Sequence, residues 1–437
     1  MARGLIIAAA RSGSGKTVIT LGLLRALRDA GLRIAAAKAG PDYIDPTYLS
    51  AACGVPCRNL DAWAMRPATL AAQIDVLARD AEVILCEGVM GLFDGAGTAA
   101  AGSTADLAAL TGWPVVLVVE AEGQGASIAA LVEGFARHRS DVRIAGVILN
   151  RVASPRHADI LREAVVRSAA PTRCLGALPR ANDLALPSRH LGLVPAGERQ
   201  DLDAFIARAA VQATQHLDCR ALIDVAQPSR LPPAAPGAMP PPLGQRIAIA
   251  RDDAFLFAYP ATLDAWRAAG AELSFFAPLA DETPGAGCDA VYLPGGYPEL
   301  FAARLAANRR FLDGLCAMAT HGAAVYGECG GYMVLGQALT DAAGETHAMA
   351  GLLPVATSFA AKKLHLGYRQ VELAVETPLG GKGTAFRGHE FHYASIVDER
   401  GGTPLFEGVD ADGKPVGAMG RVVGTAMGSF VHLIDRA

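Results

Sequence analysis

A proline-rich segment between residues 227 and 245 divides this chain of 437 residues and constrains its fold more than any other feature. Proline fixes φ and has no amide hydrogen, so the segment cannot hold a helix or an inner strand. We therefore predict a semi-rigid linker over residues 226–245, between one domain at 1–225 and a second at 246–437. The length of the chain suits two such domains. The seven prolines are Pro228, Pro232, Pro233, Pro236, Pro240, Pro241 and Pro242.

Short apolar runs alternate with amphipathic stretches on both sides of this segment. Such alternation predicts an α/β fold for both domains, with a mostly parallel sheet in the first. Ligands of parallel sheets bind at the carboxyl ends of the strands. In the first domain we expect strands at 5–10, 33–38, 82–86, 115–120, 143–150 and 174–178, and a helix from 16 to about 30. In the second we expect strands at 246–250, 273–277 and 290–293, a helix from about 258 to 269, and a strand-rich tail from Gly367 onward that leaves room for short helices.

The composition excludes several classes of protein. A net charge of −4 gives no electrostatic basis for binding nucleic acid or a membrane surface. No apolar run reaches the length of a membrane span, and the N-terminus lacks the apolar core of a signal peptide. The 8 cysteines are scattered, and the close pair Cys53 and Cys57 has no second pair to complete a zinc site. We therefore expect a cytoplasmic protein with reduced cysteines.

A glycine-rich loop follows the first expected strand and opens the first expected helix. The phosphate-binding pattern G-x-x-x-x-G-K-[ST] is matched at Gly15, Lys16 and Thr17, whereas its first position holds Ala10. Backbone amides around Gly13 and Gly15 would cradle phosphates. Lys16 would reach the outer phosphates and Thr17 would contact Mg²⁺. The alternative is a turn that only caps a helix, but the strand before the loop and the helix after it favour an ATP site.

Polar residues also follow other strands of the first domain. A lysine and two acids lie close together after the second strand, at Lys38, Asp42 and Asp45, and suit a metal or an activated carboxylate. A surface turn is the alternative there. Glu87 ends the third strand, where an acid beside a phosphate-binding loop holds Mg²⁺ directly or through water. Asn150 ends the fifth strand and either contacts a base edge or simply leaves the strand as a polar residue.

Cys329 lies between a short apolar run at 323–326 and a stretch that can open a helix. A thiol on such a strand-to-helix turn is exposed to a substrate carbonyl, and the amides of the helix favour the thiolate. A cysteine nucleophile also needs donors for the oxygen that becomes negative. The amides of Gly295 and Gly296, after the strand at 290–293, are the predicted donors.

A histidine must act as the base for this thiol. His432 follows a strand-like run late in the chain and is the predicted partner. His321 is nearer in sequence but is expected at the far end of the strand that precedes the turn. His389 and His392 remain alternatives, and His392 is equally well read as a core residue.

The second domain resembles a class I glutamine amidotransferase domain. The resemblance rests on the Gly-Gly-Tyr-Pro-Glu turn at 295–299, the Gly-Glu-Cys-Gly-Gly elbow at 327–331 and the late His432. The class I pattern places a glutamate two residues after this histidine, where the chain has Ile434. That departure is typical of the cobyric-acid branch of these domains, so the resemblance implies a dyad of Cys329 and His432. What orients the histidine without the acid stays open.

Residues 1–225 resemble the dethiobiotin-synthetase-like P-loop fold. Three long runs, at 38–46, 87–95 and 388–393, match one family over the full length of the chain. On these runs the chain is identified as a member of the cobyrinic acid a,c-diamide synthase family, including its hydrogenobyrinic acid counterpart. The resemblance implies a carbon–nitrogen ligase that uses glutamine and ATP·Mg²⁺ to amidate two side-chain carboxylates of a corrinoid in cobalamin synthesis.

The same resemblance implies roles for the candidate residues. Cys329 would take glutamine to a thioester and release ammonia, which would reach the first domain and trap an acyl phosphate as an amide. Asn150 would contact adenine, and the region of His389 and His392 is a candidate for corrinoid contact. The Mg²⁺ ligands would come from Thr17, Asp42, Asp45 and Glu87. The activated carboxylate and its phosphate would lie near Lys38, Asp42 and Asp45.

Two other functions compete with this interpretation. Cobyric acid synthase amidates other carboxylates of the same ring with the same two domain types, but the run at 87–95 favours the a,c enzyme. A regulatory P-loop ATPase of the partition type, with a non-catalytic second domain, usually has a second lysine early in its loop, and residues 11–14 contain none. The sequence leaves open the metal content of the ring, the order of amidation, the ammonia route and the oligomeric state, with a homodimer as one alternative.

Overall fold

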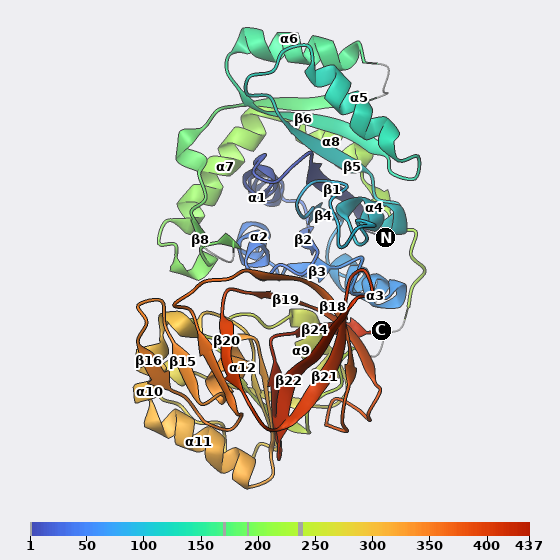
Figure 1. Cartoon of the computed structure of the whole chain (residues 1–437). Coiled ribbons are helices and arrows are strands. Elements are labelled where there is room, and N and C mark those ends of the chain that lie inside the picture. The colour runs from blue at the N-terminus through green and yellow to red at the C-terminus, as the bar shows by residue number, and fades with distance from the viewer. Residues whose placement is uncertain (1, 169–171, 190–191, 235–238) are drawn as a thin grey trace. The chain divides into compact units, whose positions relative to one another are not determined.

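The computed structural model describes residues 2–168, 172–189, 192–234 and 239–437, and the chain forms two compact units, Met1–Gly237 and Ala238–Ala437 (Figure 1). Both units are α/β, which confirms the predicted fold class. Each strand and helix that the sequence analysis located is present, with ends within two residues of the expected ones. Within the described ranges, no helix is long and apolar enough to cross a membrane.

The first unit is built on an eight-stranded sheet in which seven strands run parallel in the order β3-β2-β4-β1-β5-β6-β7. Strands β2 and β4 are buried along their whole length, as expected for a parallel sheet covered on both faces. These strands are β1 (Arg3–Ala9), β2 (Ile34–Ala39), β3 (Arg58–Leu60), β4 (Val83–Glu87), β5 (Val115–Glu120), β6 (Ile144–Val152) and β7 (Arg173–Pro179), with a small hairpin of β8 (Ser188–Arg189) and β9 (Gly192–Leu193) beside the sheet.

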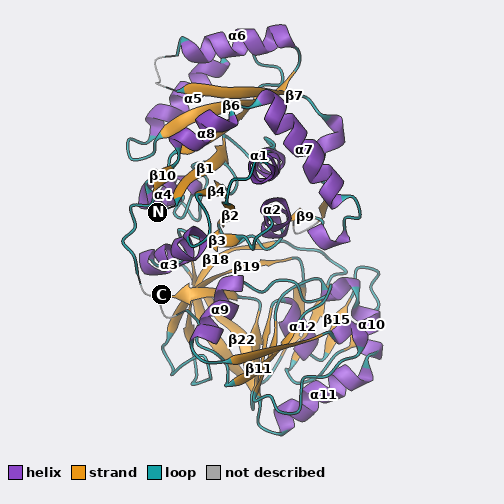
Figure 2. Cartoon of the chain, turned by 180° about the vertical axis from the view of Figure 1, so that it is seen from behind, coloured by secondary structure: helices purple, strands orange, loops and turns teal. Residues whose placement is uncertain are grey.

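Helices cover both faces of this sheet (Figure 2). From β1 the chain first adds β2 and β3 at one end of the sheet, and it then returns through β4 and continues from β5 to β7 at the other end. Right-handed crossovers therefore put α1 and α2 on one face and α3 to α6 on the other, and α7 packs against α1. The loops after β1, β2 and β4 meet where this direction reverses, which is where such sheets bind ligands. The helices are α1 (Lys16–Asp29), α2 (Asp45–Cys53), α3 (Pro67–Ala78), α4 (Thr104–Thr111), α5 (Ile128–His138), α6 (Pro155–Val166), α7 (Leu202–His216) and α8 (Cys219–Val225).

The segment predicted as a linker is attached at both of its ends. At its start, β10 (Gln227–Pro228) pairs antiparallel with the beginning of β1, and Arg230 donates its amide to Thr111 O at 2.7 Å. At its end, the indole of Trp266 donates to Pro240 O at 3.0 Å. The described residues of this segment form no helix and no inner strand, as expected, because β10 is a two-residue bridge that pairs with β1 alone. Residues 235–238 of the predicted linker lie outside the described residues.

The second unit contains a ten-stranded mixed sheet in the order β12-β11-β13-β14-β23-β22-β21-β18-β19-β24. The run from β12 to β23 is parallel and the remaining pairs are antiparallel. The strands of this sheet are β11 (Arg246–Ala250), β12 (Glu272–Phe276), β13 (Ala290–Leu293), β14 (Ala324–Glu328), β18 (His365–Leu373), β19 (Ala385–His392), β21 (Thr403–Asp410), β22 (Pro415–Val423), β23 (Ala426–Ser429) and β24 (His432–Arg436).

A second, four-stranded sheet and four α-helices complete this unit. The sequence left short helices possible in the tail, and after residue 335 the described chain forms only strands, turns and loops. The four-stranded sheet consists of β15 (Ala338–Thr340), β16 (Thr346–Ala348), β17 (Val355–Ser358) and β20 (Ser395–Glu399). The helices are α9 (Pro260–Ala268), α10 (Ala302–Ala307), α11 (Arg309–Thr320) and α12 (Gly330–Leu335).

Helix α12 packs directly on the end of β13 through Gly331. A Cβ added at Gly331 would lie 2.0 Å from the carbonyl oxygen of Leu293, which is too close for any side chain. We expect Gly331→Ala to lower the free energy of unfolding by about 2–3 kcal/mol, since backbone must move to admit the methyl group. Denaturant unfolding measures this loss, and Gly381→Ala is the control because a Cβ there meets nothing within 4 Å. Equal stability of the two variants would contradict this close packing.

Candidate functional site

The phosphate-binding loop is held open by two glycines in left-handed conformations. Gly13 has φ 78° and Gly15 has φ 88°, and Gly15 caps α1. The side-chain amide of Asn150, from the end of β6, donates to Ser14 O at 2.8 Å. A Cβ on Gly15 would lie 2.3 Å from that amide nitrogen, so the contact requires glycine. In this ligand-free chain Asn150 therefore supports the loop.

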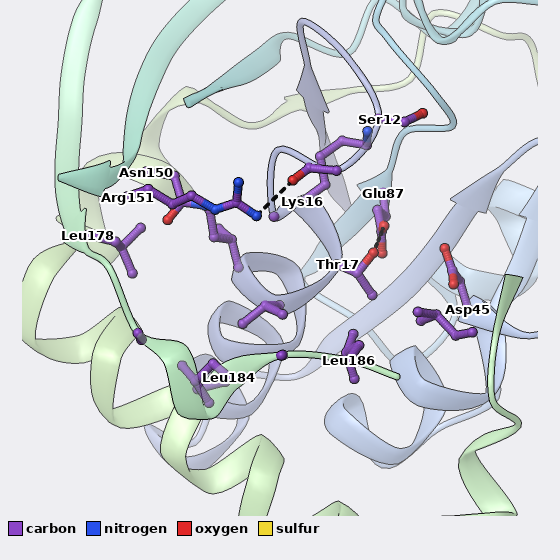
Figure 3. A pocket seen from close by; sticks show the side chains of 18 of the residues that line it. Ser12, Lys16, Thr17, Asp45, Glu87, Asn150, Arg151, Leu178, Leu184 and Leu186 are labelled. Carbon is purple, nitrogen blue, oxygen red and sulfur yellow. Dashed lines mark hydrogen bonds between the residues drawn. The ribbon is translucent and has the colours of Figure 1, made fainter. Parts of the chain in front are cut away.

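Lys16 and Thr17 both reach toward the end of β4 (Figure 3). The Lys16 ammonium donates to Met90 O at 2.5 Å, and burial lowers the pKa of this lysine. The Thr17 hydroxyl donates to Oε1 of Glu87 at 2.7 Å. Glu87 is fully buried, burial raises its pKa, and its Oε2 has no hydrogen-bond partner among the described residues. A buried carboxylate oxygen without a partner beside a threonine hydroxyl fits a site for a divalent cation.

Lys38 joins this pair to the loop that follows β2. Its ammonium lies 3.1 Å from Oε1 of Glu87 and 2.5 Å from Oδ2 of Asp45. Burial by itself lowers the pKa of Lys38, but the carboxylates of Asp45, Glu87 and Asp42 outweigh it, so the net pKa is raised and the lysine stays charged. The buried cation thus neutralises the acids that surround it.

Asp42 has a different local role from Asp45. Its Oδ1 accepts the amides of Ile44 at 2.7 Å and Asp45 at 3.0 Å, which fixes the turn into α2. Burial and the nearby charge of Asp45 raise the pKa of Asp42 to about 7. Both acids line the same cavity as Lys38, so the structure brings this whole cluster to one place.

This cavity has a volume of about 870 Å³, which suits a nucleotide. One end is polar, with the phosphate-binding loop and Glu87, and the other is lined by Leu178, Leu184 and Leu186 (Figure 3). Gln212 of α7 also lines it, and its side-chain carbonyl oxygen is buried with no hydrogen-bond partner in the described part of the chain. Phosphates therefore fit at one end and a base at the other, and sequence reasoning missed Gln212 because α7 carries no motif.

In the second unit, Cys329 occupies a strained turn between β14 and α12. Its φ of 47° and ψ of −102° are unusual for a residue with a side chain, and 2% of it is exposed. Such strain marks a nucleophile turn. A Cβ added at Gly295 would lie 2.5 Å from Cε1 of His432 and 3.4 Å from the Cβ of Cys329. The thiol, the imidazole and the glycine loop therefore converge, as the sequence predicts.

Backbone amides surround the thiol. Within the described residues, the amide of Gly296 has no hydrogen-bond acceptor, whereas Gly295 forms an isolated antiparallel bridge with Phe257, whose amide donates to Gly295 O at 2.9 Å. A Cβ added at Gly330 would lie 3.0 Å from the amide nitrogen of Gly296, so the residue after the nucleophile faces the same loop. Sequence reasoning missed Gly330, although the residue after a nucleophile commonly supplies one such amide.

In the ligand-free chain, the thiol of Cys329 and the imidazole of His432 are both neutral. Burial is the main cause that raises the pKa of Cys329, with the charge of Glu299 adding to it, and these outweigh the opposing contact with the amide of Gly330. Burial also holds the pKa of His432 well below its usual range. The expectation that helix amides make Cys329 a thiolate is therefore wrong for the ligand-free chain, because the six-residue α12 cannot offset desolvation.

The other candidate histidines do not take the place of His432. His321 is exposed at the end of α11. His389 stacks on His432 with ring centroids 5.0 Å apart and pairs with the Tyr259 hydroxyl at 2.9 Å. His392 stacks on Phe430 at 3.8 Å and donates to a backbone carbonyl. His389 therefore flanks the base, and His392 is a buried residue of the surrounding core.

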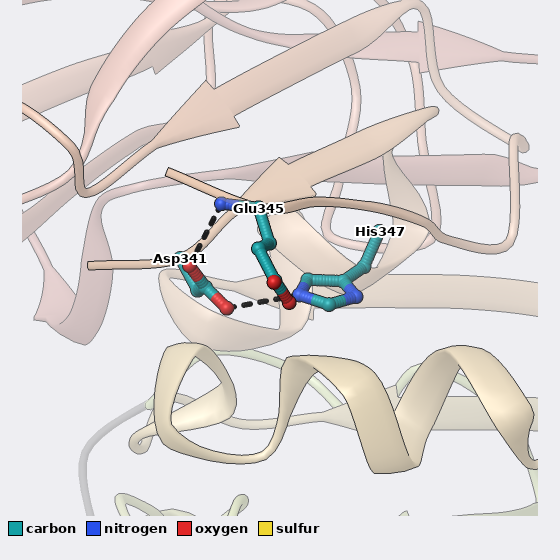
Figure 4. A group of neighbouring side chains, drawn as sticks. All are labelled: Asp341, Glu345 and His347. Carbon is teal, nitrogen blue, oxygen red and sulfur yellow. Dashed lines mark hydrogen bonds and ion pairs between the residues drawn. The ribbon is translucent and has the colours of Figure 1, made fainter. Parts of the chain in front are cut away.

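A separate group of acidic and histidine side chains lies at the β15–β16 turn (Figure 4). Asp341 accepts the amides of Ala343 and Glu345 and pairs with His347 Nε2 at 2.9 Å. These contacts close the turn, and we assign the group a structural role.

The two units together define a class of enzyme. A nucleotide-sized cavity with a phosphate-binding loop, joined to a buried cysteine–histidine site, is the arrangement of a glutamine-hydrolysing amide ligase. Residues 5–194 match the family described as "CobQ/CobB/MinD/ParA nucleotide binding domain", and residues 246–436 match "CobB/CobQ-like glutamine amidotransferase domain".

Relatives named "Hydrogenobyrinate a,c-diamide synthase" match nearly the whole chain. The protein of Brucella suis is 54% identical over 99% of this chain and 98% of its own length. Those of Rhizobium meliloti and Mesorhizobium japonicum are 52% and 50% identical, over at least 99% of both chains. The chain belongs to the hydrogenobyrinate a,c-diamide synthase family, and the resemblance drawn from its motifs is confirmed.

The raised pKa of Asp42 predicts a specific pH dependence of stability. Between about pH 4 and pH 7 the folded chain keeps a proton on Asp42 that the unfolded chain has released, so this group lowers the free energy of unfolding as pH rises through that window. Asp42→Asn keeps an oxygen for the two amides and removes the charge. We expect its thermal midpoint to exceed that of the parent chain by a margin that grows from about pH 4 to about pH 8.

Calorimetry without nucleotide measures this margin. Asp75→Asn, at an exposed position of α3, is the matched control and should show no such trend. A margin for Asp42→Asn that is constant with pH would contradict the raised pKa.

Proposed function

We propose that this chain uses ATP and glutamine to amidate the a and c side-chain carboxylates of hydrogenobyrinic acid, in the biosynthesis of cobalamin. The strained Cys329 beside His432, in one chain with a phosphate-binding loop and a buried acid, is the observation that carries the proposal. The names of the full-length relatives favour hydrogenobyrinic acid over cobyrinic acid as the substrate. The reaction belongs in the cytoplasm, where the eight cysteines, all free, would stay reduced.

The second unit would release ammonia from glutamine. The Cys329 Sγ attacks the carboxamide carbon and its proton passes to His432, while the amides of Gly295, Gly296 and Gly330 donate hydrogen bonds to the oxygen that becomes negative. His432 then gives the proton to the leaving nitrogen, which departs as ammonia and leaves a thioester. Water hydrolyses the thioester, which releases glutamate and restores the thiol.

The first unit would activate the corrinoid carboxylate. A carboxylate oxygen attacks the γ-phosphorus of ATP and ADP leaves, and ammonia then attacks the acyl carbon and displaces phosphate. Lys16 would exchange its contact with Met90 O for the phosphates, and Lys38 with Asp42 and Asp45 would face the carboxylate. Asn150 and the apolar end of the cavity would contact adenine.

Magnesium fits the same cluster. Thr17 and Glu87, with Asp42 and Asp45 nearby, would hold it, and its charge would neutralise the phosphates. The unpartnered Oε2 of Glu87 supports this assignment. All of these residues come from one chain, so the proposal is compatible with a monomer or a homodimer.

Two competing functions have less support. The domain families cover both a,c-diamide and cobyric acid synthases, but the full-length relatives that match carry the a,c name. The regulatory ATPase alternative does not account for the buried His432 beside the strained Cys329.

The number of amide groups added to each candidate corrinoid acid identifies the substrate. After incubation with glutamine, ATP and Mg²⁺, we expect mass spectrometry to find hydrogenobyrinic acid with two added amide groups and no further change. Cobyrinic acid, offered separately, should react more slowly. ATP hydrolysis without any mass change in either acid would contradict the a,c assignment. Amidation of more than two carboxylates would favour the cobyric acid synthase alternative.

Removal of the thiol should separate the two half-reactions. We expect Cys329→Ala to abolish glutamine-dependent amidation and to spare amidation driven by added ammonium, because the first unit needs only ammonia. Cys288→Ala, a half-buried cysteine of the same unit, is the matched control and should keep both activities. Loss of the ammonium-driven activity in a folded Cys329→Ala protein would contradict this division of labour.

A further inference from the structure

The histidine of the thiol site lacks the acid that class I domains place two residues further along the strand. That position is Ile434, which is apolar and 1% exposed. A histidine that accepts a proton in a buried site needs a fixed ring orientation and a nearby negative charge that stabilises the imidazolium. Neither can come from Ile434, so another group must supply them.

The carboxylate of Glu328 lies beside the imidazole of His432. Its Oε2 is 3.8 Å from Nδ1 of the imidazole, while Cε1 of the ring faces Gly295. Glu328 is the last residue of β14, and Cys329 directly after it leaves the strand with φ 47°. Both Glu328 and His432 are buried, so their attraction is little screened by water.

Three hydrogen bonds hold this carboxylate in place. Tyr292 donates to Oε2 at 2.7 Å, Tyr326 donates to Oε1 at 3.0 Å, and the amide of Leu433 donates to Oε1 at 3.2 Å. The last bond ties the acid to the residue that follows the histidine, and so fixes the acid relative to β24. The carboxylate is therefore anchored before any substrate binds, as a preorganised charge must be.

We propose that Glu328 is the positioning residue of the thiol site, and that it replaces the missing acid of the class I pattern by orienting His432 and stabilising its protonated form. The inference rests on the proposed roles of Cys329 and His432. When the imidazole takes the proton of Cys329, attraction between the cation and the carboxylate would close the 3.8 Å gap to a charge-assisted hydrogen bond.

The groups around the acid are suited to this role. Burial raises the pKa of Glu328 to about 7, so the acid is poised near neutral pH. Among the described residues, the other titratable groups around the two side chains are Tyr292 of β13, Tyr326 of β14, Tyr259 before α9, and His389 and His392 of β19. Burial lowers the pKa of His389 to about 3, and burial raises those of Tyr292 and Tyr326, so these neighbours stay neutral.

Glu328→Gln tests the charge while keeping the shape. We expect kcat for glutamine hydrolysis to fall by at least about tenfold with little change in KM, toward the roughly 10⁴-fold loss that follows amide replacement of the acid in a serine triad. The rate of inactivation by a diazoketone analogue of glutamine should rise around pH 7 in the parent chain, as Glu328 ionises, and this rise should be absent from Glu328→Gln. A merely structural role would not move this profile.

Asp435→Asn is the matched control, because it removes a buried carboxylate from β24, the strand that carries His432, and should leave the pH profile unchanged. If Glu328→Gln does not fold, Tyr292→Phe removes the hydroxyl bonded to Oε2 and raises the pKa of Glu328. That variant should lose activity near pH 7 and recover it near pH 9.

An unchanged profile and kcat in Glu328→Gln, or an unchanged profile in Tyr292→Phe, would overturn the inference. Failure of the diazoketone to label Cys329 in the parent chain would instead overturn the proposed function, so the two failures are distinguishable.

Discussion

Both sites depend on backbone that approaches a functional side chain too closely to carry a Cβ. Gly15 lets the phosphate-binding loop lie against Asn150, and Gly295 lets the second loop lie against His432. Each glycine follows the carboxyl end of a parallel strand, where amides are not used by the sheet. Packing of this kind leaves amides free and aimed at one point, and the charged or strained side chains are then arranged around that point.

The charged groups of the two sites are stabilised in different ways. In the first unit, Lys38 stands between Asp45 and Glu87, so buried charges of opposite sign neutralise one another. In the second unit, Cys329 and His432 are neutral at rest, and charge would develop only when a proton moves between them. On the proposed function, the first arrangement would prepare a site for phosphate and metal, whereas the second would make the reactive ion pair depend on a bound substrate.

Sequence alone located most of the fold, because long apolar runs and glycine-rich turns are local signals. It missed β3, which has three residues, and β10, which lies in a proline-rich segment, because their pairing is decided by distant strands. It found the residues with motifs but missed Glu328, whose partners come from β13 and β24, and Gln212, which becomes visible only as part of a cavity. It also assigned Cys329 the wrong resting state, since burial depends on the whole core.

The burial of Cys329 has a consequence for the lifetime of the enzyme. Peroxides and chance electrophiles attack the exposed thiolate form of cysteine, and this thiol is 2% exposed and protonated at rest. On the proposed function, Cys329 would thus be shielded from oxidation until glutamine binds. The same burial that makes activation harder keeps the catalyst reduced without a disulfide or a repair partner.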